Sequence, residues 1–299
     1  MIQRQKLHPE GPEVSRMVWG AWRALESPLT DSAPKLLRVI ETALDLGITT
    51  MDHADIYGGY AVEEAFGDAL ALAPALRQRM ELVTKCGIAL VSPERPDHRV
   101  KHYNSTAAHI RASVERSLKN LRTDRIDVLL LHRPDPLLAA DEVALVLTEL
   151  LQSGKLRHIG VSNYTNAQLA LLQSRLSSPL VTNQIEISLA HTVPLADGTL
   201  DDAQRLRMSP MIWSPLGGGS LLGKPGLAEL LARLAKKYDL PSPAAVAIAW
   251  LLRLPSRPVP ILGTMNAERL RELAAADGVI LELQDWFQLL EAATGREVA

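Results

Sequence analysis

The chain of 299 residues alternates short apolar runs with longer amphipathic patterns from its first residues to its last. The apolar runs have strand character, and they occupy residues 15–20, 48–52, 80–85, 125–132, 155–163, 180–189, 210–217 and 258–264. A helical pattern follows each of these runs. Strands that alternate with helices pair in parallel, and eight such units close into a (β/α)8 barrel. We therefore predict an α/β fold, a single (β/α)8 TIM barrel domain over residues 1–299.

An open, doubly wound sheet is the alternative fold for this alternation. Its dinucleotide-binding form carries a G-x-G-x-x-G turn after the first strand, and the segment after residues 15–20 lacks that pattern. No Pro-, Gly- or Ser-rich linker divides the chain, which favours one barrel. One helical pattern spans residues 226–253, and a terminal helix is expected at 281–295. The connections at 86–104 and 190–200 are long, and such loops in a compact domain are usually functional.

Charge and composition argue against several classes of protein. The net charge is −2, and acidic and basic residues are interspersed, whereas nucleic acids and anionic membranes need a one-signed surface. Cys86 is the only cysteine, which excludes an internal disulfide and a multi-cysteine metal site. No segment is apolar enough for a signal peptide or a membrane span. We expect a cytoplasmic protein that is monomeric, needs no metal and binds neither nucleic acid nor membrane.

Polar side chains gather where the predicted strands end. Asp52, Lys85 and His132 close three consecutive strands, and Tyr57 follows Asp52 by five residues. Taken singly, each has an ordinary explanation, such as a helix cap, a snorkelling lysine or a packed histidine. Further residues of interest end the later strands: Ser162, Asn163, Gln184, Trp213, Ser214, Gly263 and Thr264. The carboxyl ends of barrel strands surround one pocket, so we predict a shared site.

The first four of these residues form a coherent proton-transfer group. A lysine ammonium near a phenol favours the phenolate and could lower the tyrosine pKa by roughly 1–3 units. The carboxylate of Asp52 would keep Lys85 charged, and His132 could hydrogen-bond a substrate oxygen or relay a proton. Tyr57 would then protonate an oxygen as it becomes an alkoxide. Because no side chain delivers hydride, a nicotinamide or flavin cofactor is implied.

Several ordered motifs resemble those of the aldo-keto reductases, and of the bacterial oxidoreductases within that family, over roughly residues 15–275. MDHADIYGG is similar to the family's D-x-A-x-x-Y-G signature, and LVTKCG and LLLHRPDP resemble its lysine and histidine strands. GKLRHIGVSNY resembles the specific pattern G-K-[IV]-R-x-[IV]-G-V-S-N-[FY]. The segments NQIE, WSPLGGG and ILGTMNAERL follow in the family's order.

The resemblance implies an NADP(H)-dependent barrel enzyme that reduces the carbonyl group of a small molecule. Its catalytic tetrad would be Asp52, Tyr57, Lys85 and His132, with Tyr57 as the proton donor. The residues implied at the cofactor are Gly20, Trp22, Ser162, Asn163, Gln184, Trp213, Ser214, Pro215, Leu216, Gly217, Gly218, Gly263, Thr264 and Arg269. Within this set the polar trio at 162, 163 and 184 would hold the nicotinamide carboxamide, and Trp213 would stack on its ring. Thr264 and Arg269 would contact the 2′-phosphate.

The chain also departs from the family's pattern. Gly263 stands where the family often has a lysine, and Leu273 stands where an asparagine contacts the adenine. The terminal helix is expected to pack rather than to reach the substrate. Candidate substrate contacts lie on the loops and are Trp22, Tyr60, His102 and Tyr103. Trp22 and apolar loop residues suit a hydrophobic or aromatic aldehyde, and the physiological substrate stays open.

Two neighbours of the signature have structural interpretations. We expect His53 to pack and Asp55 to satisfy the loop backbone. Two other functions stay open at this point. A barrel of this resemblance can be a cofactor-binding regulatory or sensing subunit with slow turnover. A barrel isomerase or lyase could use Lys85 as a Schiff base, but it would leave the nucleotide motifs unexplained.

Overall fold

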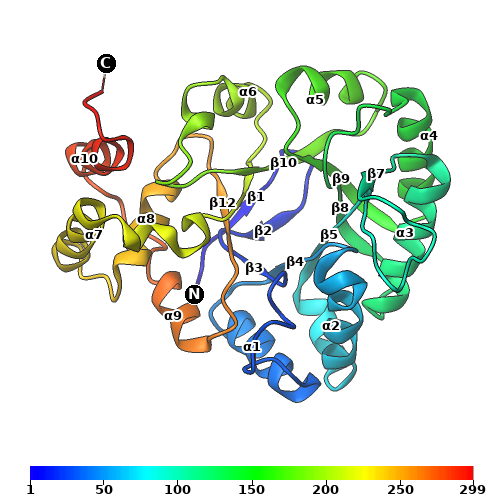
Figure 1. Ribbon diagram of the computed structural model, residues 1–299, viewed down its shortest axis with the longest axis horizontal. Coiled ribbons are helices and arrows are strands. Elements are labelled where there is room, and N and C mark those ends of the chain that lie inside the picture. The colour runs from blue at the N-terminus through cyan, green and yellow to red at the C-terminus, as the bar shows by residue number, and fades with distance from the viewer. Residues whose placement is uncertain (299) are drawn as a thin grey trace.

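Eight parallel strands close into a barrel in the computed structural model, which describes residues 1–298 apart from the side chains of Leu222 and Pro225. The strand order around the barrel is β10, β11, β12, β3, β4, β5, β8 and β9. The bounds are β3 Val18–Gly20, β4 Thr50–Asp52, β5 Glu81–Cys86, β8 Ile126–Leu131, β9 Leu156–Ser162, β10 Leu180–Glu186, β11 Met211–Trp213 and β12 Val259–Leu262. The predicted (β/α)8 barrel is confirmed, and the helices surround the strands (Figure 1).

The helices begin where the sequence supplies caps. Thr106 caps the α3 helix through the backbone N–H of His109, and Thr165 and Gln168 form a capping box at α5. These caps satisfy backbone donors that have no partner inside the helix. The helical bounds are α1 Ala33–Asp45, α2 Val62–Ala71, α3 Ala107–Asn120, α4 Ala140–Gln152, α5 Asn166–Gln173, α6 Thr199–Arg205, α7 Pro225–Lys237, α8 Pro243–Leu252, α9 Ala267–Ala274 and α10 Leu283–Thr294.

The helical pattern expected over residues 226–253 is two helices, α7 and α8. A non-glycine residue with positive φ, Asp239 at 51°, lies in the break, and Ser242 caps the second helix. Pro243 stands at the start of α8, where its missing N–H costs nothing. The helical pattern at 226–253 is apolar enough to predict one continuous helix. The prolines of the segment LPSP nevertheless divide it into two.

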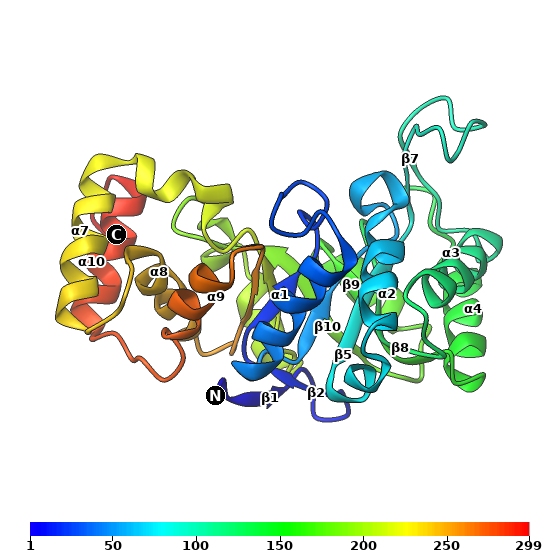
Figure 2. The ribbon, with the colours of Figure 1, turned by 90° about the horizontal axis from the view of Figure 1, so that it is seen from below.

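An antiparallel hairpin lies at the amino-terminal end of the barrel and was not predicted. It consists of β1 Arg4–Lys6 and β2 Glu13–Ser15, and Figure 2 shows it on the opposite side from the long 86–104 loop. Leu7 and Val14 of this segment are fully buried and join the apolar cluster inside the barrel. This end of the barrel is thereby packed with apolar side chains, which leaves the carboxyl ends of the strands for polar ones.

The loops at the carboxyl ends contain short elements of their own. The 86–104 loop carries a small hairpin of β6 Ile88–Ala89 and β7 His102–Tyr103. Short 3-10 turns occupy η1 Tyr57–Tyr60, η2 Pro74–Arg79, η3 Val193–Leu195 and η4 Gly217–Gly223. Within the part of the chain described, no helix combines the length and apolar character needed to cross a membrane.

Candidate active site

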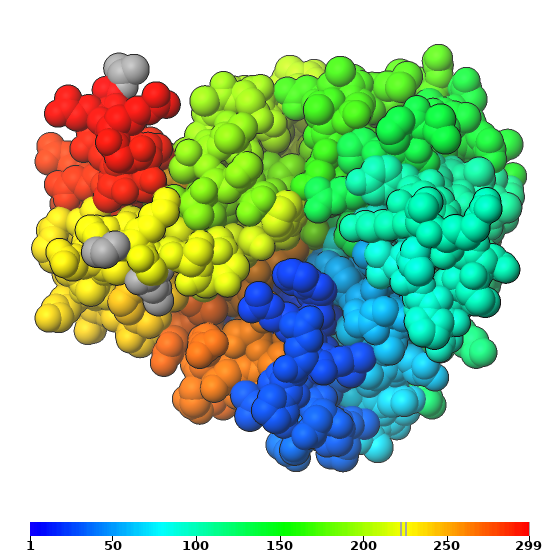
Figure 3. Space-filling view, in the orientation of Figure 1, coloured from blue at the N-terminus to red at the C-terminus, as the bar shows by residue number. Residues whose placement is uncertain are grey.

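A cavity of about 720 Å³ opens at the carboxyl ends of the barrel strands. Figure 3 shows this face hollowed between the blue segment after β3, the yellow segment after β11 and the cyan 86–104 loop. The predicted site residues that line the cavity are Gly20, Trp22, Asp52, Tyr57, Tyr103, His132, Ser162, Asn163, Gln184, Trp213, Ser214, Pro215, Leu216, Gly218, Gly263, Thr264 and Arg269. Its volume is within the usual range for small-molecule sites.

Lys85 lies directly beneath the cavity and is fully buried. Its Nζ donates hydrogen bonds to Asp52 Oδ2 at 2.7 Å, to the His53 carbonyl oxygen at 2.7 Å and to Tyr57 Oη at 3.0 Å. An ammonium group has three N–H donors, so all three are used. Burial favours the neutral amine, but the charge of Asp52 and the contact with Tyr57 outweigh it and raise the pKa of Lys85. Lys85 is therefore held as a cation.

The hydrogen bond from Lys85 sets the direction of the Tyr57 hydroxyl group. Because Tyr57 Oη accepts the bond from Lys85, its own O–H proton points away from the lysine. Burial raises the pKa of Tyr57; Lys85 lowers it and Asp52 raises it, and the net shift is upward. The prediction of a net lowering is wrong, because the desolvation of a phenolate here outweighs the attraction of the ammonium. Tyr57 keeps its proton at neutral pH.

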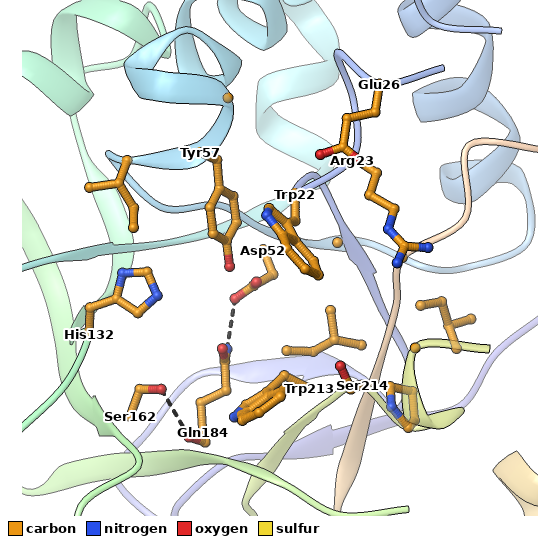
Figure 4. A pocket seen from close by; sticks show the side chains of 18 of the residues that line it. Trp22, Arg23, Glu26, Asp52, Tyr57, His132, Ser162, Gln184, Trp213 and Ser214 are labelled. Atoms are coloured by element: carbon orange, nitrogen blue, oxygen red, sulfur yellow. Dashed lines mark hydrogen bonds between the residues drawn. The ribbon is translucent and has the colours of Figure 1, made fainter. Parts of the chain in front are cut away.

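The carboxylate of Asp52 binds both Lys85 and Gln184, which is distant in the sequence. Its Oδ1 accepts a hydrogen bond of 2.8 Å from Gln184 Nε2, drawn as a dashed line in Figure 4. Both carboxylate oxygens of Asp52 are therefore occupied. The amide nitrogen of Gln184 is committed to Asp52, which leaves Oε1 for a ligand.

His132 faces the same space as Tyr57 (Figure 4), and the two ring centroids are 6.0 Å apart in an edge-to-face arrangement. Burial, followed by the charge of Lys85, lowers the pKa of His132 well below its usual value. The imidazole is neutral at physiological pH and can donate one N–H bond. Its Nδ1 is buried and has no hydrogen-bond partner among the described residues.

The turn that carries Tyr57 needs its two glycines. Gly58 and Gly59 have φ of 58° and 65°, which is the left-handed region. A Cβ on Gly58 would also lie 2.9 Å from the side chain of Val62. Glycine adopts this conformation without steric cost, so the backbone can reverse just beyond the tyrosine and enter α2.

A chain of hydrogen bonds links the residues at the ends of β9, β10 and β11. Ser162 Oγ donates to the Gln184 carbonyl oxygen at 3.0 Å, and Asn163 Nδ2 donates to Ser162 Oγ at 2.7 Å. Trp213 Nε1 donates to Asn163 Oδ1 at 2.9 Å. Asn163 and Ser214 have φ of 59° and 49°. Non-glycine residues rarely adopt this region, and such strain gathers at binding sites.

The opposite end of the cavity suits a phosphate-bearing group. Gly218 and Gly219, with φ of 65° and 97°, line it with backbone. Gly263, Thr264 and Arg269 line the same cavity at the end of β12 and the start of α9. Arg269 forms no ion pair within the described part of the chain. Exposed backbone amides and a free guanidinium are the donors that phosphates bind.

Four predicted site residues are not in the cavity wall. Lys85 is buried beneath the cavity. Gly217 faces Ala190, whose Cβ would lie 2.8 Å from a Cβ at position 217. Tyr60 Oη accepts a bond of 2.8 Å from the Leu90 backbone N–H, so it holds the 86–104 loop. His102 Nδ1 pairs with the Val100 carbonyl oxygen at 2.9 Å. Tyr60 and His102 therefore do not line the cavity, and their role as substrate contacts stays a prediction.

Other residues line the cavity without having been predicted as contacts. They are Arg23, Glu26, Ile56, Gly58, Gly59, Ile88, Leu90, Lys101, Arg133, Ile261, Leu262 and Leu273. Sequence signals could have found two of the four charged ones: Arg133 directly follows His132, and Lys101 lies in the long 86–104 loop. In the described residues, no group of three or more His, Cys, Asp or Glu side chains could hold a metal ion.

His53 and Asp55, the two residues of the MDHADIYGG motif with structural interpretations, have different surroundings. His53 is fully buried against Phe66, with ring centroids 4.3 Å apart, which confirms the packing prediction. Burial lowers its pKa to about 3. The buried carboxyl oxygens of Asp55 make no hydrogen bond of good geometry with the described residues. The backbone N–H of Ile56 and the Ser113 hydroxyl still favour its charged form, so its contact with the loop backbone stays a prediction.

Comparison with known proteins decides the family. The model of the Aldo/keto reductase family matches residues 16–291.

The chain belongs to the aldo/keto reductase family.

This aldo/keto reductase is 52% identical to oxidoreductase YdhF of Escherichia coli, with 100% of both chains covered. It is 49% identical to a 6-dehydroglucose reductase of Agrobacterium fabrum, over 96% of this chain and 97% of the relative. Among solved structures, the thermostable aldo-keto reductase Tm1743 superposes with a TM-score of 0.83 at 26% identity, covering 97% of this chain and 100% of that one. Glycerol dehydrogenase AKR11B4 of Gluconobacter oxydans gives 0.84 at 25% identity, covering 100% and 97%. Family membership implies NADP-linked carbonyl oxidoreduction.

Proposed function

We propose that this aldo/keto reductase reduces aldehydes and ketones to alcohols with NADPH, and that Tyr57 is the general acid. The observation that carries the proposal is that all three N–H donors of Lys85 are used in hydrogen bonds. Since its three N–H groups bind Asp52, the His53 carbonyl and Tyr57, the proton of the phenol is free to face the cavity.

Each member of the tetrad has a distinct task in this proposal. Tyr57 donates its proton to the carbonyl oxygen as negative charge develops there, and Lys85 stabilises the phenolate that is left. Asp52 keeps the lysine charged and in place. Neutral His132 hydrogen-bonds the carbonyl oxygen and orients it toward Tyr57. NADPH supplies the hydride when it is bound.

The same charge on Lys85 argues against the Schiff-base alternative. A lysine nucleophile must be neutral and free to attack. Lys85 is fully buried, it donates three hydrogen bonds, and its pKa is raised. The isomerase or lyase mechanism is disfavoured for this reason.

The positions of several residues around the cavity support the cofactor contacts that we propose. We assign the nicotinamide carboxamide to Ser162, Asn163 and the free Oε1 of Gln184, and the ring face to Trp213. The backbone from Ser214 to Gly219 suits the pyrophosphate, and Gly20 and Trp22 border the reaction centre. Thr264 and Arg269 suit a 2′-phosphate, which favours NADP(H) over NAD(H) although Gly263 supplies no charge. A single domain over residues 1–299, a monomer and a cytoplasmic location stay predictions.

Replacing Tyr57 by Phe tests the proposal. Loss of a general acid lowers kcat by about 10²–10⁴-fold, while NADPH binding measured by fluorescence titration stays unchanged. Activity is followed as NADPH consumption with aldehydes, ketones and the sugar aldehyde that the name of the Agrobacterium relative indicates. Tyr164→Phe is the matched control, because the buried Tyr164 hydroxyl has no hydrogen-bond partner to lose among the described residues. A Tyr57→Phe enzyme as active as wild type would refute the assignment. Tight NADPH binding without any turnover in wild type would favour a regulatory subunit.

A further inference from the structure

Two cations border the cavity on the side of the reaction centre. Arg133 directly follows His132 at the end of β8, and Lys101 directly precedes β7 in the 86–104 loop. In the barrel order, β8 lies four strands from β12, which is the far side of the barrel. Lys101 and Arg133 are therefore separate from Arg269 and the proposed 2′-phosphate site at the end of β12.

Arg133 is half-buried, and its guanidinium group lies over the Trp213 ring. Its guanidinium carbon lies 5.6 Å from the centroid of the Trp213 ring. Asp135 is near in sequence, but its two oxygens accept bonds from the backbone N–H groups of Ser105 and Leu137. Arg133 takes part in no ion pair within the residues that the structure describes.

Lys101 is exposed at the mouth of the same cavity. The antiparallel pairing of Ile88 with Tyr103 and of Ala89 with His102 fixes the base of its loop. Among the described residues it forms no ion pair either. After burial and Lys85, the charges of Arg133 and Lys101 are smaller contributors to the low pKa of His132, so both cations lie near the reaction centre.

The acidic residues of the cavity do not neutralise this pair. Asp52 is occupied by Lys85 and Gln184. Glu26 follows β3 and lies with Arg23 on the Ser214 side of the cavity in Figure 4, away from His132. Cationic donors without partners at a binding site favour ligands that carry oxygen acceptors.

We infer that Lys101 and Arg133 are specificity-determining residues that hold an oxygen-rich part of the substrate while its carbonyl group faces Tyr57 and His132. This inference rests on the proposed reductase function and names its substrate class, a small aldehyde with hydroxyl or anionic oxygens beyond the carbonyl. It differs from the apolar or aromatic aldehyde that Trp22 and the loop composition suggested. Hydroxyl groups and a carboxylate or phosphate share the acceptor chemistry that the two cations recognise.

The test compares three aldehydes of similar size. Glyceraldehyde offers hydroxyl groups, succinic semialdehyde offers a carboxylate, and butanal offers neither. Wild type should show a higher kcat/KM for at least one oxygenated aldehyde than for butanal. Lys101→Met and Arg133→Met should each lower that kcat/KM by roughly tenfold or more, the scale of a lost charge-assisted hydrogen bond. The kcat/KM for butanal should change by less than about threefold.

The control and the contrary outcomes separate the inference from the proposed function. Lys236→Met removes an exposed cation on α7 outside the cavity and should change none of the ratios. A larger loss with succinic semialdehyde identifies an anionic substrate, and a larger loss with glyceraldehyde identifies a hydroxylated one. A wild-type preference for butanal, or equal losses on all three aldehydes, would overturn the inference and leave the reductase function intact. Turnover of none of the three would overturn the inference, and it would contradict the reductase function as well only if the wider panel of aldehydes and ketones also gave no turnover.

Discussion

At the scale of single residues, Asp55 has an environment that differs strongly from that of an ordinary aspartate. It is 5% exposed, and burial, followed by the charge of Glu63, raises its pKa to about 8. The ordinary value in an unfolded chain is about 3.9. Between these two values the folded protein binds more protons at this site than the unfolded chain does. The contribution of Asp55 to stability is therefore complete below about pH 4 and is lost as the pH rises to about 8.

Asp55→Asn should remove this pH dependence, because the amide is neutral at every pH. Between about pH 5 and pH 8, the free energy of unfolding should fall less in the variant than in wild type. Urea unfolding at a series of pH values measures the difference. Asp239→Asn, at an exposed aspartate, serves as the control and should follow wild type. Parallel curves for Asp55→Asn and wild type would show that the Asp55 carboxyl is ionised in the folded protein.

At the scale of elements, the approach of α2 to α3 depends on a missing side chain. A Cβ on Gly67 of α2 would lie 1.9 Å from the backbone oxygen of Asn120, at the end of α3. Alanine has the higher helix propensity by about 1 kcal/mol, yet such a contact forces the two helices apart. The glycine is therefore required by packing and not by its backbone conformation.

Gly67→Ala should lower the free energy of unfolding by about 1–3 kcal/mol, the usual effect of overpacking. Gly226→Ala in α7 is the matched helical control, because its Cβ would meet nothing within 4 Å. That variant should be neutral or stabilised by less than about 1 kcal/mol. Denaturant titration compares them, and equal effects of the two substitutions would contradict the packing argument.

At the scale of the whole molecule, α10 packs against α7 and, through Trp286, against α8, away from the cavity. Trp286 stacks on Trp250 with centroids 5.1 Å apart, and each indole N–H donates to the other residue's carbonyl oxygen. Lys237 pairs with Glu282 and Asp285 at the start of the helix. No residue of α10 lines the cavity in the described chain. The terminal helix therefore packs on the barrel, as predicted.

Trp286→Ala should cost about 2–4 kcal/mol of unfolding free energy, since a large aromatic contact is lost. The kcat/KM of the folded variant should match wild type, because α10 contributes no residue to the cavity wall. Phe287→Ala, at a more exposed neighbour (38%), should cost less. Thermal or urea unfolding with a parallel assay measures both. A loss of activity at full folding would show that α10 acts on the site.

The sequence by itself determined the order of the elements and the set of residues at the strand ends. Hydrophobic periodicity is a local property, and a parallel barrel brings all carboxyl ends of its strands to one face. For this reason the sequence alone assigns Asp52, Tyr57 and His132 to one pocket. The same reasoning could not find the amino-terminal hairpin or divide α7 from α8, because their short signals compete with longer apolar patterns.

Only the tertiary structure decided how those residues act on one another. The bond from Gln184 to Asp52 joins positions 132 residues apart, and no local pattern encodes such a pairing. The pKa of Tyr57 is raised because the effect of burial exceeds the opposing effect of the Lys85 charge. Burial in turn depends on how the surrounding loops pack. The places of Tyr60, Lys101 and Arg133 relative to the cavity were decided in the same way. Hydrogen bonds and desolvation act over distances in space, whereas a sequence orders residues only along the chain.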